Sequence, residues 1–494
     1  MARTQEPENI LGPRSEARRT APAEAIGPNA LDGIADDHRG ISLAPVLGLE
    51  QAESMTVTDL LVTTVGASTH DRYIRSDVIN MTGGDTTPPG NLVGKSLSTG
   101  YGPAPIVYAG DYGNPLCLPG SWAPNTFTDE IVVCDRGTNG RVEKSGVVQA
   151  AGGDGMVLAN DPPNAGTLNG DAHIIPSSHI SHADGVVLKQ WLATGSGHMA
   201  TISDFSVSED AAFGDHLAAF SSRGQNRALP DIVTPSITAP GLDIFAAYQD
   251  QSGATQDFNI VSGTSMASPH VAGAAALIMA LHPDWSPAEV QSAMMLTAQP
   301  DLVLEDGVTP ADPFDIGNGR IDVPATAQAG LVMHETIENY EGANPAVGTI
   351  EVKELNLASM GEDECMGGSC SWTRTVRATT DGSWTASGAV GPDLVTVTVA
   401  PAAFSLSAGQ TQELTITAVS SSAPDTGIWE FGHAIIEGTG GPMHMPVAIK
   451  SVSDPTAVTT ADFSAGSGTT LPLALFGLTA VGLAGLALWR RRSA

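Results

Sequence analysis

The sequence of 494 residues has little positive charge. It contains 22 lysine and arginine residues against 54 aspartate and glutamate residues, and its formal net charge is −32 at pH 7. Such an acidic surface repels phosphate backbones, so we predict no nucleic acid partner. Charged residues make up only 15 % of the chain, which also contains 55 glycines and 33 prolines. This composition excludes a mainly disordered or coiled-coil protein and is typical of two to four loop-rich globular domains.

Cysteine is also scarce, and its occurrences fall into two local pairs. Cys117 and Cys134 form one pair, Cys365 and Cys370 the other, and neither pair has the spacing of a metal site. We predict a disulfide within each pair, which indicates an oxidising compartment. The alternative is four free, buried thiols.

The two ends of the chain give different indications of location. Residues 1–30 contain no apolar run of the length that a signal peptide needs. At the other end, the 19 apolar residues from Leu471 to Trp489 would rise about 28 Å as a helix, enough to cross a bilayer core of about 30 Å. Arg490–Arg492 follow at once and would stay cytoplasmic, so we predict an extracytoplasmic protein that contacts the membrane through this helix. The tail also resembles cleaved bacterial sorting signals, and a buried helix is the remaining alternative.

The pattern of apolar residues changes along the chain. Residues 1–55 show no sustained period and predict no element. Between residues 106 and 195, strand-like runs alternate with two helix candidates, which predicts a compact α/β module. An α/β pattern continues over residues 200–335, and beyond about Ile350 the pattern is purely β, at spacings typical of a small sandwich.

The strongest chemical signal is the segment GTSMASPHVAG, residues 263–273. Ser265 follows Gly-Thr where a helix begins, so its hydroxyl would lie at the positive end of the helix dipole, with its own N–H as an oxyanion donor. Both features suit a nucleophile. Pro269 is expected in the first turn, where proline is tolerated, and Pro283 is expected to end the helix. His270 lies about 140° around the helix from Ser265, so we do not assign it as the base.

These eleven residues resemble the nucleophile motif of the subtilisin-like serine peptidases, or subtilases. The resemblance implies that Ser265 is the nucleophile of a serine endopeptidase that acts on protein or peptide substrates and needs no cofactor. Flanking segments extend the resemblance. FSSRG from Phe220 and DIVTPSITAPG from Asp231 resemble plant-type members in particular, and PFDIGNGRIDV from Pro313 resembles the closing segment of the family domain. The WSPAEV segment from Trp285 predicts a helix, with Ser286 as N-cap and Pro287 at its first position.

Two further regions resemble modules of plant-type subtilases. Residues 106–195 resemble the protease-associated domain that is inserted in the catalytic domain, and residues 345–452 resemble the fibronectin type III-like domain that follows it. The first region holds His173, His179 and His182. No cysteine or carboxylate completes this set as a zinc site, so we predict no metal.

The resemblance is incomplete at its start. A subtilase needs an aspartate, a histidine and an oxyanion asparagine in motifs that precede the inserted domain, and none of these motifs is found. His38 and His70 are the only histidines before residue 106, and neither lies in a matching motif. We therefore expect a chain that begins in the middle of a catalytic domain, through truncation or a frame disruption, or one completed in trans by a separate polypeptide. The alternative from a different class is a catalytically silent, surface-anchored binding protein.

The expected fold class is α/β: a partial subtilisin-like parallel-sheet domain with an inserted protease-associated α/β domain, a C-terminal β-sandwich and a C-terminal transmembrane helix. The expected divisions are an unstructured or spurious N-terminus (1–55), the partial catalytic domain (56–105 and 200–335), the protease-associated domain (106–195), the sandwich (345–452), a linker (453–470), a transmembrane or sorting helix (471–489) and a basic tail (490–494).

Overall fold

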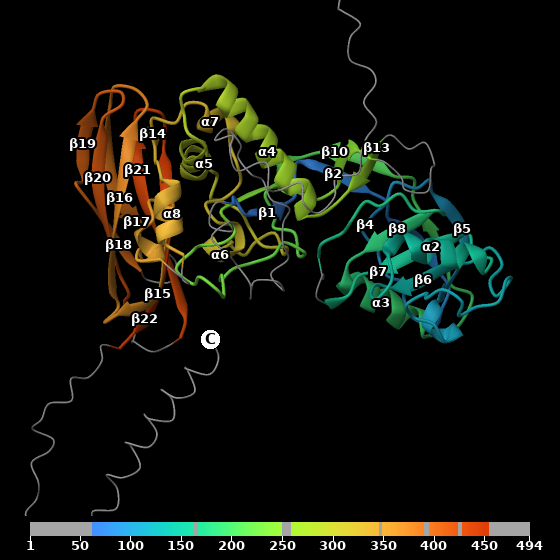
Figure 1. Ribbon diagram of the computed structural model, residues 1–494. Coiled ribbons are helices and arrows are strands. Elements are labelled where there is room, and N and C mark those ends of the chain that lie inside the picture. The colour runs from blue at the N-terminus through green and yellow to red at the C-terminus, as the bar shows by residue number, and fades with distance from the viewer. Residues whose placement is uncertain are drawn as a thin grey trace, which may run out of the picture.

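The computed structural model describes residues 62–162, 166–248, 258–344, 348–389, 395–422 and 427–453. These residues form three units that lie side by side (Figure 1). We call them the seven-stranded unit (78–202), the central unit (62–77 and 203–330) and the C-terminal unit (331–453). The segments expected at 1–55, 471–489 and 490–494 lie outside the described residues.

The seven-stranded unit is built on one mixed sheet with the strand order β3-β9-β5-β6-β7-β8-β4. Its elements are β3 (Val78–Thr82), β4 (Gly94–Lys95), β5 (Tyr101–Tyr108), β6 (Ile131–Asp135), α2 (Arg141–Ala150), β7 (Gly155–Ala159), β8 (Ser177–Ile180), α3 (His182–Leu192) and β9 (Met199–Ile202). Strands β5 to β8 run parallel, and all five residues of β7 are buried, as expected for a parallel strand covered on both faces. The sheet extends beyond residues 106–195, since β3 and β4 precede this range and β9 follows it.

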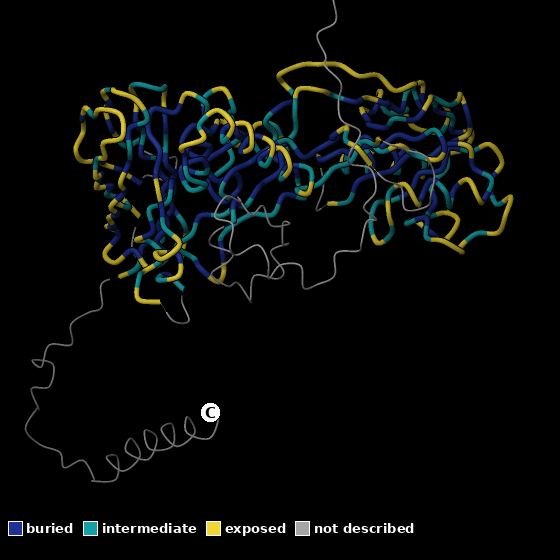
Figure 2. The backbone as a smooth tube through the Cα atoms, turned by 45° about the horizontal axis from the view of Figure 1, so that its top comes forward, coloured by how far each residue is buried: buried dark blue, intermediate teal, exposed yellow. Residues whose placement is uncertain are grey.

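The two helices of this unit cover opposite faces of the sheet. Val148 of α2 packs in the same buried cluster as Val132, whereas Leu188 of α3 packs in the same cluster as Val133. Successive side chains of a strand point to opposite faces, which explains how neighbours on β6 belong to different clusters. Figure 2 shows buried residues in the interior of the units and exposed residues in the outer loops.

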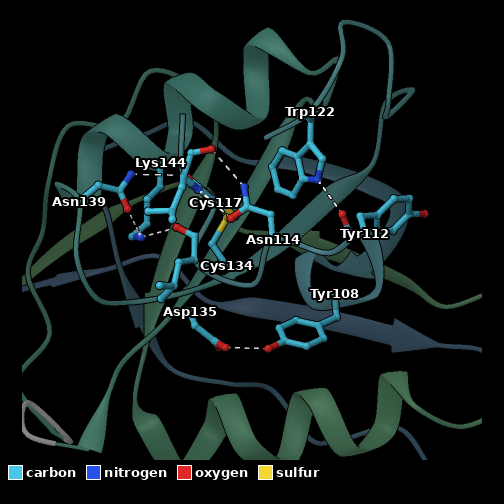
Figure 3. Close-up of a disulfide and its surroundings, with 11 residues drawn as sticks. Tyr108, Tyr112, Asn114, Cys117, Trp122, Cys134, Asp135, Asn139 and Lys144 are labelled. Atoms are coloured by element: carbon cyan, nitrogen blue, oxygen red, sulfur yellow. Dashed lines mark hydrogen bonds between the residues drawn. A yellow bond between two sulfur atoms is a disulfide. The ribbon is translucent and has the colours of Figure 1, made fainter. Parts of the chain in front are cut away.

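Cys117 and Cys134 form the predicted disulfide on the α2 face of this sheet. Figure 3 shows the bridge beside the buried side chain of Lys144, which donates hydrogen bonds to the Leu116 carbonyl and to Asn139 Oδ1. Burial lowers the pKa of Lys144 to about 8. The disulfide and this lysine together hold the loop before Cys117 against β6 and α2.

The C-terminal unit consists of two facing sheets around a shared core. One sheet has the order β14-β16-β20-β18 and the other the order β15-β22-β21-β17-β19. The elements are β14 (Leu331–Val332), α8 (Ile337–Gly342), β15 (Met360–Met366), β16 (Ser369–Ala378), β17 (Gly382–Ala389), β18 (Thr396–Ala400), β19 (Ala403–Leu406), β20 (Thr411–Val419), β21 (Trp429–Gly438) and β22 (Met443–Val452). Buried and exposed residues alternate along β16, and Trp372 and Trp384 enter the common core from different sheets. The predicted disulfide between Cys365 and Cys370 joins β15 to β16.

The central unit contains a short parallel sheet and most of the helices. Its elements are β1 (Val65–Ser68), β2 (Arg72–Arg75), β10 (Ser206–Glu209), β11 (Ile237–Pro240), β12 (Ile244–Ala247), β13 (Phe258–Val261), α4 (Thr264–Leu281), α5 (Pro287–Leu296), α6 (Pro313–Ile316) and α7 (Val323–Thr326). β1 pairs with β11 in parallel, whereas β2 with β10 and β12 with β13 are antiparallel pairs. The predicted start of α5 is confirmed, because Ser286 Oγ accepts the Glu289 N–H and a Glu289 carboxylate oxygen accepts the Ser286 N–H.

Helix α4 is the longest helix among the described residues, and one of its faces packs on β1 and β11. The buried residues of that face are Ala267, Val271, Ala274, Ala275 and Ile278. Beside that face, Leu277 is 63 % and Leu281 57 % exposed. Within the described ranges, α4 alone is long and apolar enough to cross a membrane, and its contacts with the sheet account for part of that apolar character.

Candidate active site

The connection from β13 to α4 presents Ser265 at the surface. Strand β13 leads through Ser262 into Gly263, whose extended backbone forms the N-cap of α4. Ser265 is the second residue of the helix and is exposed. The predicted placement of a serine hydroxyl at the positive end of a long helix is therefore what the structure shows.

Among the described residues, two backbone N–H groups in the first turn of α4 have no partner. The N–H groups of Met266 and Ala267 donate to the Gly263 carbonyl, at 3.0 and 3.4 Å. Those of Thr264 and Ser265 have no acceptor among the described residues. Unpaired donors at a helix N-terminus can stabilise an oxygen that gains negative charge during a reaction.

Gly241, at the end of the Ala-Pro-Gly turn, sets the position of this helix start. Its carbonyl accepts the Gly263 N–H at 2.8 Å, and a Cβ on Gly241 would lie 2.8 Å from both Ala67 Cβ and the Gly263 carbonyl oxygen. Only glycine fits so close an approach. The turn therefore brings the end of β11 against the start of α4.

Pro269 does not lie in the first turn of the helix, as we expected from the sequence. The helix begins at Thr264, so Pro269 is the sixth helical residue and lies in the second turn. A proline there has no N–H to donate to the carbonyl four residues earlier, which is that of Ser265. The expectation was wrong in register, since it placed the helix start too close to the proline; the predicted end before Pro283 is confirmed.

No side chain among the described residues forms a hydrogen bond with Ser265 Oγ. His270 is exposed, and its Nδ1 donates to the Met266 carbonyl one turn earlier on the same helix. His70 Nδ1 accepts the Arg72 N–H and its Nε2 donates to the Asp243 carbonyl, so both ring nitrogens are engaged. Burial lowers the pKa of His70. His38 lies outside the described residues.

The histidine cluster of the seven-stranded unit is divided between different surroundings. His179 is buried, and His173 is half-buried with both ring nitrogens shielded from solvent. Burial lowers the pKa of His173 to about 4 and that of His179 to about 3. His182 lies at the start of α3, where its Nδ1 donates to the Asn160 carbonyl. In the part of the chain that the structure describes, no three histidine, cysteine or acidic side chains are close enough together to hold a metal ion.

The Subtilase family model matches residues 51–319, more than half of the chain. The chain belongs to the subtilase family. Among curated proteins, this subtilase is 36 % identical over 334 residues to subtilisin-like protease SBT1.7 and 38 % identical over 339 residues to subtilisin-like protease SBT1.6, both of Arabidopsis thaliana. These matches cover 63 % and 64 % of this chain and 44 % of each relative. The chain thus spans less than half the length of the curated relatives it matches.

Among solved structures, the subtilisin-like protease Apa1 of the Antarctic psychrotroph Pseudoalteromonas sp. AS-11 is 16 % identical, with a TM-score of 0.21. That match covers 54 % of this chain and 53 % of the other. Family membership therefore rests on the sequence matches.

Sequence reasoning missed one group of residues in this subtilase that lies close to the site. Asp243 follows the Ala-Pro-Gly turn and contacts Lys95, Gly170, Ser262 and His70. One signal in the sequence pointed to Lys95, because lysine is rare in this chain. The apolar pattern did not predict the two-residue strand in which Lys95 lies.

Proposed function

We propose that Ser265 is the nucleophile of a serine endopeptidase that hydrolyses peptide bonds in protein or peptide substrates. Ser265 Oγ would attack the peptide carbonyl and lose its proton to a base, the amine would leave with a proton, and water would then hydrolyse the acyl-enzyme. The observation that carries the proposal is the exposed hydroxyl beside two unpaired N–H groups at the start of α4, inside the region that matches the family. These N–H groups would stabilise the oxyanion of the tetrahedral intermediate.

The base that this reaction needs is not found near Ser265 among the described residues. We propose that the catalytic histidine, the aspartate that orients it and the oxyanion asparagine belong to catalytic-domain polypeptide beyond this chain. Two observations support this: the chain spans less than half of its relatives, and α4, the helix that carries Ser265, exposes Leu277 and Leu281. In this mechanism, loss of one triad member already costs a factor on the order of a million in turnover.

Hydrolysis of casein and peptide anilides tests the proposal. The 494-residue chain should show no detectable activity, and a version that carries the upstream catalytic region of a relative should be active. Ser265→Ala should abolish that activity, and Ser268→Ala, one turn along the same helix, should retain it. Equal activity of Ser265→Ala and its parent would contradict the proposal, and a folded but inactive completed protein would favour a silent binding protein instead.

The flanking units support a plant-type architecture. We propose that the seven-stranded unit, which includes residues 106–195, is a protease-associated domain inserted between β2 and β10 of the catalytic domain. Its sheet, covered by helices on both faces, supports this assignment. We propose that residues 345–452 form a fibronectin type III-like sandwich, supported by two facing sheets around one core.

We propose an extracytoplasmic location, at the cell surface or on a membrane to which residues 471–489 anchor the chain. The two disulfides support an oxidising compartment. Deletion from Leu471 onward should release the protein from the membrane fraction. A full-length chain that is already soluble, with its tail intact by mass spectrometry, would contradict the anchor.

A further inference from the structure

A buried ion pair joins the seven-stranded unit to the central unit. Lys95 Nζ lies 3.0 Å from Asp243 Oδ2, and the two side chains are only 7 % and 3 % exposed. In every other ion pair between described residues, at least one side chain is 26 % exposed or more. Burial of two charges costs more than an exposed pair does, so this pair needs further partners to be stable.

Asp243 has such partners on both sides of the interface. From the seven-stranded unit, the Gly170 N–H donates to Asp243 Oδ1 at 2.8 Å. From the central unit, the Ser262 hydroxyl donates to the same oxygen at 3.3 Å, and the Asp243 N–H donates back to Ser262 Oγ at 2.9 Å. The Asp243 carboxylate thus links Lys95 and Gly170 of the seven-stranded unit to Ser262 of the central unit.

Ser262 is the residue through which these contacts reach the nucleophile. It lies three positions before Ser265, and Gly263, which follows it, is the N-cap of α4. Two bonds tie this segment to the end of β11: that from Asp243 N to Ser262 Oγ and that from Gly263 N to the Gly241 carbonyl. The direction of the Ser262 side chain therefore depends on where Asp243 is held.

The backbone of Asp243 also depends on its neighbours. Its φ is +54°, in the left-handed region, which costs a non-glycine residue free energy unless the surroundings stabilise it. The His70 ring helps to do so, because its Nε2 donates to the Asp243 carbonyl at 3.3 Å. Loss of the lysine would remove the strongest electrostatic contact that holds this conformation.

We propose that Lys95 and Asp243 are positioning residues, through which the seven-stranded unit fixes Ser262 and with it the start of α4 that presents Ser265. The proposal rests on the proposed function only in taking Ser265 as the nucleophile. In this proposal, the seven-stranded unit affects the position of Ser265 through these contacts, apart from any contact that it makes with substrate.

Hydrogen exchange of the full 494-residue chain, measured for the peptides that cover Ser262 to Met266, tests the connection. In Lys95→Met, exchange there should be roughly tenfold faster than in the parent, because Asp243 loses its buried counter-ion. Lys95→Arg should restore the parent rate, since a cavity of about 100 Å³ beside the pair has room for the larger head group. Lys189→Met is the matched control, because it breaks an ion pair with Asp135 inside the seven-stranded unit, and should leave these peptides unchanged.

Unchanged exchange from Ser262 to Met266 in a folded Lys95→Met protein would overturn the proposal, as would an equal increase in Lys189→Met. If Lys95→Met fails to fold, the double variant Lys95→Met, Asp243→Asn leaves no unpaired buried charge and takes its place. Faster exchange from Ser262 to Met266 in that variant than in the parent supports the proposal, and the same rate as in the parent overturns it. Exchange needs no catalytic activity, so this outcome stands apart from the hydrolysis experiment, which tests the role of Ser265.

Discussion

The seven-stranded unit and the central unit are both α/β, yet they bury their apolar surface to different extents. In the seven-stranded unit, α2 and α3 cover both faces of the sheet. In the central unit, the described parallel sheet has two strands, and α4 covers it with one face and exposes two leucines beside that face. The β12–β13 hairpin adds a stacked aromatic pair, Phe245 and Phe258, that is 58 % and 57 % exposed. The described part of the central unit thus leaves apolar side chains exposed, and we propose that further catalytic-domain polypeptide covers them.

The largest expected effect comes from truncating a leucine in each unit. Leu188→Ala, at a fully buried site on α3, should lower the unfolding free energy of the seven-stranded unit by about 2–5 kcal/mol. Leu277→Ala, at an exposed position of α4, should change stability by no more than about 0.5 kcal/mol. Hydrogen exchange through a urea series, analysed unit by unit, measures both.

In a version that carries the upstream catalytic region of a relative, we expect a larger effect of Leu277→Ala. If that region packs against Leu277, then Leu277→Ala in this version should lower the unfolding free energy several times more than in the 494-residue chain. An equal, small decrease in both proteins would show that Leu277 stays exposed, and the difference in burial between the two units would then need no further polypeptide.

Removal of the Cys117–Cys134 disulfide should have the next largest effect, confined to the seven-stranded unit. The bridge joins residues 17 apart, and closing such a loop contributes about 3 kcal/mol by loop entropy. The double variant Cys117→Ser, Cys134→Ser should therefore unfold this unit at lower urea. The double variant Cys365→Ser, Cys370→Ser removes a bridge between residues 5 apart and should lower the unfolding free energy of the C-terminal unit by less, about 2 kcal/mol. Labelling of any thiol in the unreduced parent would contradict full pairing.

Acid should weaken the seven-stranded unit through its buried histidines. Burial lowers the pKa of His173 to about 4 and of His179 to about 3, whereas both titrate near 6.5 in the unfolded chain. The unfolded chain therefore binds more protons below pH 6.5, and stability should fall as the pH drops, by about 2 kcal/mol per histidine between pH 7 and 5. Asp171, whose charge interacts with both rings, stays ionised across this range because the hydrogen-bonded Arg141 lowers its pKa.

The double variant His173→Asn, His179→Gln separates this effect from general acid sensitivity. Its unfolding free energy should depend less on pH between 7 and 5 than that of the parent, whatever its absolute stability. The same slope in the parent and the double variant would show that these histidines are not responsible.

Local sequence signals predicted the elements that depend on neighbouring residues. The start of α5 at Ser286 and Pro287 and the bridge between Cys365 and Cys370 require contacts only a few residues apart. The position of Ser265 at the start of α4 follows from the same kind of local motif.

Contacts between distant segments could not be predicted in this way. Lys95 and Asp243 are 148 positions apart, and β4, which holds Lys95, has only two residues and no apolar period. The register of α4 at Pro269 was also missed, because a proline in the second turn contradicts the ordinary preference for the first. For Lys95 and Asp243, tertiary packing outweighs the local pattern.

Labelling with a fluorophosphonate, followed by mass mapping of the modified peptide, tests most directly the central proposal that Ser265 is a nucleophile whose base lies beyond this chain. The 494-residue chain should remain unlabelled, because a serine hydroxyl without a base is a weak nucleophile. The version with the upstream catalytic region restored should be labelled at Ser265, and Ser265→Ala should abolish that label. Robust labelling of Ser265 in the 494-residue chain alone would contradict the account.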